Sequence, residues 1–125
     1  MIRALTSKAF RLQRQEISEA AVLSAVLIRL QYDRRVAWVA RMNIGAHVVD
    51  DGKRRRFIRY GFPGCSDLIG QLRDGRFLAV EVKRPTARAT EAQAEFLAQV
   101  RANGGVSGIA RSVSDVEVLL NGATT

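Results

Sequence analysis

The sequence predicts an α/β sandwich, in which helices cover the faces of a small mixed β-sheet. Two observations lead to this fold class. Apolar residues recur at helical spacing in segments near both ends of the chain, and apolar runs of strand length lie between and after them. Turn-forming residues separate most of these segments, so the expected order is a helix, three or four strands, a helix, a strand and a short helix.

The first predicted helix runs from Glu19 to about Asp33, with Ser18 as its N-cap. Its apolar face is wide, which indicates a well-buried helix. The chain before this helix is basic and mixed in character. We therefore expect a basic N-terminal segment over residues 1–17 and one folded domain over residues 18–125.

Strands are expected next, at 36–42, at 55–60, in a short stretch that opens at Asp67, and at 77–83. Residues 43–54 contain two glycines and an Asp-Asp-Gly sequence, which favours a loop or a hairpin turn. Asp74 and Gly75 predict a hairpin turn between the last two of these strands.

The last third of the chain returns to helices. Thr90 is the expected N-cap of a helix from about Glu91 to Ala102, which the glycines after Asn103 end. Residues 106–110 form a further strand, and a last short helix begins near Ser114 and runs to about Leu120.

The composition limits the classes of protein to which the chain can belong. A length of 125 residues with 47% apolar residues and two prolines indicates one folded domain. No apolar run approaches the roughly 18 residues of a membrane-spanning helix, and we expect no secretory signal. The single cysteine, Cys65, excludes a disulfide within the chain and fits a cytoplasmic location.

The net charge of +8 and the pI near 11.0 favour a polyanionic partner. Nucleic acid is the favoured class, because contacts to phosphates would supply much of the affinity. Charge that serves solubility, or binding to an acidic membrane surface, is the alternative.

Three charged residues lie within or beside apolar strand segments. Asp67 follows a turn, and Glu81 and Lys83 end the apolar run of the next strand. A buried charge without a partner costs several kcal/mol, and alternation places Glu81 and Lys83 on one face. Two carboxylates and an ammonium at neighbouring strand ends can bind a hard divalent cation beside a phosphate. The alternative is a turn cap and a solvated ion pair on an edge strand.

These segments together resemble the VRR-NUC family, a branch of the PD-(D/E)XK nuclease superfamily. The resemblance covers about residues 18 to 120 and rests on Arg41-Met42-Asn43, Gly64-Cys65-Ser66-Asp67-Leu68-Ile69, Glu81-Val82-Lys83-Arg84-Pro85 and Thr90-Glu91-Ala92-Gln93. One departure is Ser66, since the wider superfamily often has proline before this aspartate.

The resemblance implies a restriction-endonuclease-like core of αβββαβ type and a Mg²⁺- or Mn²⁺-dependent phosphodiesterase that acts on DNA. Its substrates would often be branched, such as Holliday junctions. Stand-alone members of this size, as in phages and bacteria, typically pair as homodimers. Two alternatives stay open: a non-catalytic nucleic-acid-binding module, and a restriction-type nuclease for duplex DNA.

In such a nuclease, Asp67, Glu81 and the carbonyl oxygen of Val82 would be metal ligands. Lys83 would orient the attacking water or offset the negative charge that develops on the phosphate.

Two further residues enter the site through the resemblance alone. Glu19 fits the glutamate that the family carries at the start of its first helix, and would be a fourth acidic ligand. Glu16 is an alternative to it, and charge complementarity with the helix dipole is the alternative role of either residue. Gln93 resembles the glutamine that supports such active sites, and an exposed helical amide is its alternative.

Basic residues supply the candidate DNA contacts, and the densest cluster lies beside Phe57 and Tyr60, which offer a stacking surface. A solvated hairpin is the alternative for this cluster. We expect DNA contacts from Arg41, Asn43, Lys53, Arg54, Arg55, Arg56, Arg59, Arg84 and Arg88.

Overall fold

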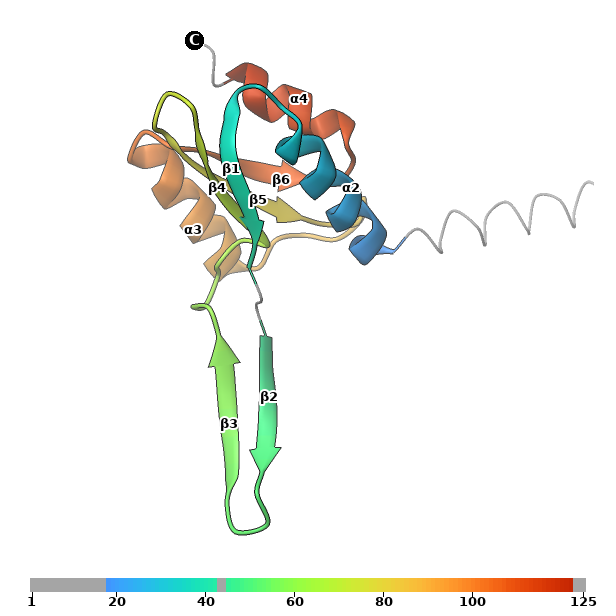
Figure 1. Cartoon of the computed structure of the whole chain (residues 1–125), viewed down its shortest axis with the longest axis vertical. Coiled ribbons are helices and arrows are strands. Elements are labelled where there is room, and N and C mark those ends of the chain that lie inside the picture. The colour runs from blue at the N-terminus through green and yellow to red at the C-terminus, as the bar shows by residue number, and fades with distance from the viewer. Residues whose placement is uncertain (1–17, 43–44, 123–125) are drawn as a thin grey trace, which may run out of the picture.

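The computed structural model describes residues 18–42 and 45–122 and shows a mixed α/β fold (Figure 1). The helices are α2 (Glu19–Gln31), α3 (Glu91–Ala102) and α4 (Ser114–Asn121). The strands are β1 (Val36–Arg41), β2 (Gly45–Asp50), β3 (Arg55–Tyr60), β4 (Leu68–Leu72), β5 (Phe77–Val82) and β6 (Val106–Ala110). No helix in these described ranges is both long and apolar enough to cross a membrane.

Four of the strands form a mixed sheet in the order β1-β4-β5-β6. β4 is antiparallel to both β1 and β5, whereas β5 and β6 are parallel. A parallel pair needs a crossover connection, and α3 provides it. Without β2 and β3, the order along the chain is αβββαβ followed by α4, so the predicted small mixed sheet flanked by helices is confirmed and is compatible with a restriction-endonuclease-like core.

Alternate residues of β5 face opposite sides of this sheet. Leu78, Val80 and Val82 are fully buried in the larger core, which α2 and α4 complete. Ala79 points the other way and packs with Leu97 of α3. α2 and α4 therefore cover one face of the sheet and α3 covers the other (Figure 1), and the odd-numbered residues of β5 face α3.

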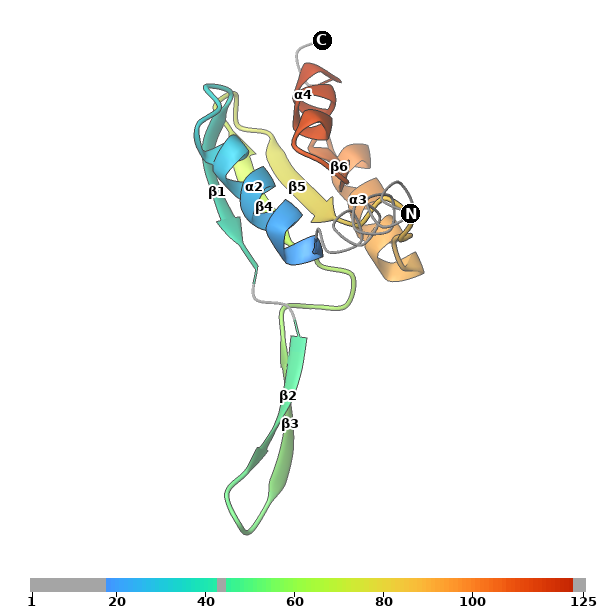
Figure 2. The ribbon, with the colours of Figure 1, turned by 90° about the vertical axis from the view of Figure 1, so that its right-hand side faces the viewer.

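β2 and β3 form a separate two-stranded ribbon that projects away from the sheet and its helices (Figures 1 and 2). The strands are antiparallel, with Gly45 opposite Tyr60 and Asp50 opposite Arg55. The expectation of a loop or turn over residues 43–54 is therefore wrong for 45–50. Gly45, Ala46 and Asp50 have low strand propensity, and pairing with β3 makes the segment a strand.

Hydrogen bonds at the helix N-termini confirm both predicted caps. Ser18 Oγ accepts a hydrogen bond from the amide of Ala21 at 3.1 Å. At the start of α3, Thr90 Oγ1 accepts from the amide of Gln93 at 3.2 Å, and Gln93 Oε1 accepts from the amide of Thr90 at 2.8 Å. This reciprocal pair is a capping box, and it fixes the direction in which the Gln93 side chain leaves the helix.

Candidate active site

Glu81 and Lys83 lie together on the face of the sheet that α3 covers. Alternation along β5 directs Glu81 to this face, and the amide of Lys83 extends the pairing by donating to the carbonyl of Ala110 at 3.1 Å. Lys83 Nζ lies 3.8 Å from Glu81 Oε1, and the two side chains are only 14% and 3% exposed. The expected same-face pair is thus buried, unlike a solvated ion pair on an edge strand.

Asp67 lies where β1, β4 and β5 come together, immediately before β4. Its Oδ2 accepts a hydrogen bond from the amide of Val82 at 2.8 Å, and its carbonyl accepts from the amide of Met42 at 2.8 Å. Ser66, which is fully buried, donates through Oγ to the carbonyl of Leu68 at 2.8 Å. The Val82 amide therefore holds the Asp67 carboxylate beside the end of β5, and the Met42 amide holds the backbone of Asp67 beside the end of β1.

The turn before Asp67 packs tightly against the start of α3. Gly64 has a φ of +83°, and a Cβ atom there would lie 2.3 Å from the carbonyl oxygen of Ala92. Only glycine tolerates both this backbone conformation and this close approach. The glycine thereby allows the Asp67 turn and the first turn of α3 to meet at one place.

Gln93 connects α3 to the buried carboxylate. Its Nε2 donates to Glu81 Oε1 at 3.1 Å, while its Oε1 is held by the amide of Thr90 in the capping box. Both ends of the side-chain amide are therefore engaged. Gln93 is therefore not an exposed helical amide, because its side chain is hydrogen-bonded to Glu81.

The environment of Glu81 disfavours its charged form. Burial raises the pKa of Glu81 to about 8, and the neighbouring Asp67 carboxylate acts in the same direction, whereas Lys83 opposes the shift. Glu81 Oε2 is buried and accepts no hydrogen bond from any residue that the structure describes. A proton or a cation would satisfy this oxygen.

Glu19 occupies the first turn of α2 and is partly exposed. α2 lies on the face of the sheet opposite to α3, so Glu19 and Glu81 approach the end of the sheet from different sides. Within residues 18–42 and 45–122, no three His, Cys, Asp or Glu side chains gather closely enough to hold a metal ion. Glu19 as a fourth ligand stays a prediction, and Glu16 and Asn43 lie outside the described residues.

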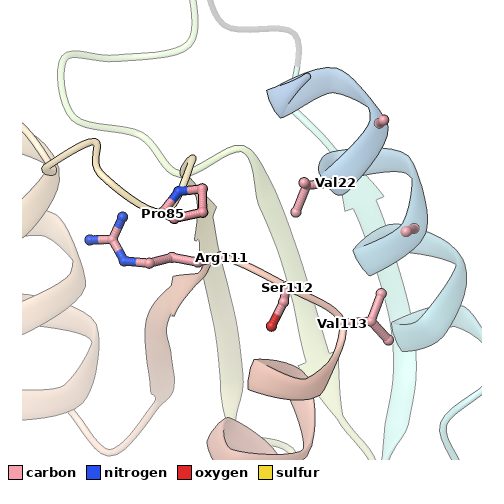
Figure 3. Close-up of a pocket in the computed structure, with 7 residues that line it drawn as sticks. Val22, Pro85, Arg111, Ser112 and Val113 are labelled. Atoms are coloured by element: carbon pink, nitrogen blue, oxygen red, sulfur yellow. The ribbon is translucent and has the colours of Figure 1, made fainter. Parts of the chain in front are cut away.

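A cavity of about 570 Å³ opens between α2, the connection after β5 and the segment that joins β6 to α4 (Figure 3). Its lining residues are Ala21, Val22, Ala25, Pro85, Arg111, Ser112 and Val113. Arg111 Nη1 donates to the carbonyl of Arg84 at 2.7 Å and also to the carbonyl of Ala87. These bonds hold the loop that follows Lys83. Sequence reasoning missed this role of Arg111, because no motif marks a side chain that binds backbone carbonyls.

The predicted DNA-binding residues fall into two groups. Arg41, Arg84 and Arg88 are exposed and lie within a few residues of the strand ends that carry the carboxylates. The second group lies on the ribbon of β2 and β3 and consists of Lys53, Arg54, Arg55, Arg56 and Arg59. The first group therefore lies close in sequence to these strand ends, and the second lies on a projecting element (Figure 2).

Cys65 does not contribute a nucleophile. Burial raises the pKa of its thiol, and the nearby charges of Glu81 and Asp67 act in the same direction. The protonated thiol is the unreactive form, so Cys65 is a small, buried packing residue.

An α/β core that buries an Asp-Glu-Lys cluster at one end of its mixed sheet defines a nuclease-type domain. The model of the VRR-NUC domain matches residues 17–114. The chain therefore belongs to the VRR-NUC family, as the motif resemblance predicts, and DNA is the implied substrate of its nuclease domain. No curated protein matches the sequence.

Proposed function

We propose that the protein is a divalent-metal-dependent, structure-selective DNA endonuclease that hydrolyses phosphodiester bonds in branched DNA such as Holliday junctions. Glu81 carries the proposal, because burial and the neighbouring carboxylate of Asp67 disfavour its charged form, and the ammonium of Lys83 offsets only part of this cost. Destabilising charges of this kind gather at functional sites. The preference for branched DNA rests on the family resemblance.

The donors at the strand ends fit Mg²⁺ or Mn²⁺. Asp67, Glu81 and the carbonyl of Val82 offer the oxygen ligands that hard divalent cations prefer, and the described residues leave Glu81 Oε2 without another partner. Bound there, the ion would polarise the phosphate and lower the pKa of the attacking water. Glu19 would complete the set as a fourth oxygen donor.

The other groups of the site orient the reactants. The Lys83 ammonium, held near Glu81 Oε1, can orient the attacking water or offset the negative charge that develops on the phosphate. Gln93 keeps the Glu81 carboxylate in one orientation, and the Val82 amide does the same for Asp67. Fixed donors of this kind need no reorganisation as the reaction proceeds.

Two further parts of the proposal concern the assembly on DNA. The phosphates that flank the cleaved bond would be bound by Arg41, Asn43, Arg84 and Arg88. The predicted DNA-binding residues on the ribbon would bind phosphates further away. A homodimer would bring two active sites to two strands. Val118 on α4 and Val113 immediately before it are exposed and available for such contact, whereas Val116 and Leu120 are buried in the core.

The test is cleavage of labelled four-way junction, flap and linear duplex DNA in Mg²⁺, Mn²⁺ or EDTA. We expect metal-dependent cutting of a branched substrate that falls by roughly 100-fold or more in Lys83→Ala. Asp67→Asn should also stop cleavage while it keeps DNA binding in EDTA, because an asparagine oxygen can still accept from the Val82 amide.

A surface variant, Arg34→Gln, serves as the matched control, because Arg34 is exposed at the end of β1 that lies away from the site. Tight binding without cleavage in any metal would instead favour a non-catalytic binding module. Equal cutting of linear and branched DNA would remove the structure selectivity and leave the nuclease.

A further inference from the structure

The ribbon of β2 and β3 is built unlike the rest of the molecule. Its two strands have six residues each and pair with each other and with no other strand that the structure describes. Val48 is 51% exposed and Phe57 is 63% exposed, so apolar surface remains in contact with solvent. Because a two-stranded ribbon is at best marginally stable in water, a partner that covers this surface would stabilise it.

The tip of the ribbon carries most of its charge. Lys53, Arg54, Arg55 and Arg56 are consecutive and exposed, and residues 45–60 contain five basic but only two acidic residues. Both acidic side chains shape the turn, since Asp51 Oδ1 accepts from the amides of residues 53 and 54, and Asp50 Oδ1 accepts from the amide of residue 52. The charge complementarity therefore indicates a polyanionic partner.

Basic side chains leave both faces of the ribbon. Alternation places Arg55 and Phe57 on one face and Arg56 on the other. A ribbon that lies flat on a protein or a lipid surface presents one face to it. A ribbon inside a groove of duplex DNA meets phosphates along both walls, which suits basic side chains on both faces.

We propose that the ribbon enters the major groove of duplex DNA and holds it independently of a metal ion. This inference rests on the proposed function only in taking DNA as the polyanion. The major groove is about 12 Å wide and admits a two-stranded ribbon, whereas the minor groove is only about 6 Å wide. Six residues of strand span about 20 Å, which corresponds to about six base pairs at 3.4 Å each.

The first measurement is the affinity for linear duplex DNA in EDTA over a range of salt concentrations. The double variant Arg54→Gln/Arg56→Gln should bind about 10-fold more weakly, and its log–log salt slope should fall by about 2. The control Arg34→Gln/Arg73→Gln removes the same amount of charge. Its two residues lie beside the ends of β1 and β4 that are furthest from the ribbon. It should change neither the affinity nor the salt slope beyond a small, non-specific loss. An unchanged slope in the ribbon variant would overturn the proposal.

The second measurement identifies the groove by protection from dimethyl sulfate, again in EDTA. We expect protection of guanine N7 in the major groove over about six base pairs, lost in the ribbon variant and kept in the control. Protection of adenine N3 alone would place the ribbon in the minor groove and overturn the proposal. Unchanged DNA binding with a change of oligomeric state in sedimentation would assign the ribbon to a second copy of the chain.

Both measurements omit metal ions and cleavage, so the ribbon and the nuclease proposals can fail separately. Melting temperatures of both double variants equal to that of wild type would show that the substitutions leave the fold intact. A protein that binds through its ribbon but cuts nothing would retain this inference and lose the proposed endonuclease.

Discussion

At the scale of single residues, Glu81 couples the candidate site to the stability of the fold. Its pKa lies near 4.5 in an unperturbed environment and rises to about 8 in the folded protein. Between these values the folded state binds more protons than the unfolded state, so the free energy of unfolding falls as pH rises from about 4.5 through about 8. The limiting slope is about 1.4 kcal/mol per pH unit.

Melting temperatures in EDTA between pH 5 and pH 9 check this prediction. Wild type should lose several degrees relative to Glu81→Gln, which cannot ionise and therefore lacks this part of the pH dependence. Asp33 does not add to the pH dependence between pH 5 and pH 9, because its hydrogen bond with Arg35 holds the pKa of its carboxyl well below this range. Parallel curves for the two proteins would assign the pH dependence to other groups.

The residues of the site differ in how far sequence predicts them. Glu81 and Lys83 could be placed together because a spacing of two puts both on one face of a strand. Their contact with Gln93 depends on α3 packing against that face, which only the family resemblance suggested. The amide of Val82 as a donor to Asp67 could not be predicted, because backbone groups carry no sequence signal.

At the scale of elements, the close contact between the Asp67 turn and α3 depends on Gly64. Gly64→Ala and Gly75→Ala both place a side chain at positive φ, which costs about 1–2 kcal/mol. Only the alanine at position 64 also drives its Cβ into the carbonyl of Ala92. We expect Gly64→Ala to lower the free energy of unfolding by about 2 kcal/mol more than Gly75→Ala does, as measured in urea. Equal losses would mean that the turn can move away from α3 without cost.

The first turn of α3 permits a separation of helix capping from site geometry. Gln93→Glu keeps an acceptor for the amide of Thr90, because glutamate suits a capping box, but it removes the donor to Glu81 and adds a negative charge. Cleavage in Mg²⁺ should fall by about 10-fold or more. Thr90→Ala should cost about 1 kcal/mol of stability and keep the cleavage rate. Equal loss of cleavage in both variants would mean that Gln93 acts only through the helix.

Helices were more predictable than strands in this chain. Ser18 and Thr90 mark the starts of α2 and α3 through side chains that satisfy backbone amides, which is a local signal. β2 is a strand because β3 pairs with it across a turn, and no local pattern within residues 45–50 announces that partner. Pairing of this kind is non-local, so the sequence predicts only a loop or a hairpin turn there.

At the scale of the whole molecule, the predicted DNA-binding residues that the structure describes lie in two places. One group lies within a few residues of the strand ends that carry the carboxylates, and the other lies on the projecting ribbon of β2 and β3 (Figure 2). The net charge of +8 predicts a polyanionic partner but not this division. The division follows from the insertion of the ribbon between β1 and β4, which carries charge away from the sheet.

The whole fold should become more stable when a divalent cation binds at the two carboxylates. A ligand that binds only the folded state raises the free energy of unfolding, by about 1.4 kcal/mol when its concentration is about ten times its Kd. The gain should be larger above pH 8 than at pH 6, because a proton on Glu81 competes with the cation. Melting temperatures in Mg²⁺ and in NaCl of matched ionic strength measure the effect.

Asp67→Asn should remove the stabilisation by Mg²⁺, since it deletes one of the two carboxylates, whereas Arg34→Gln should keep it. The Val82 amide retains an acceptor in the asparagine variant, so loss of the Mg²⁺ effect would not reflect a disrupted strand end. An equal gain in wild type and Asp67→Asn would place the bound cation elsewhere on the molecule. In that outcome, a proton and not a cation would satisfy the buried Oε2 of Glu81.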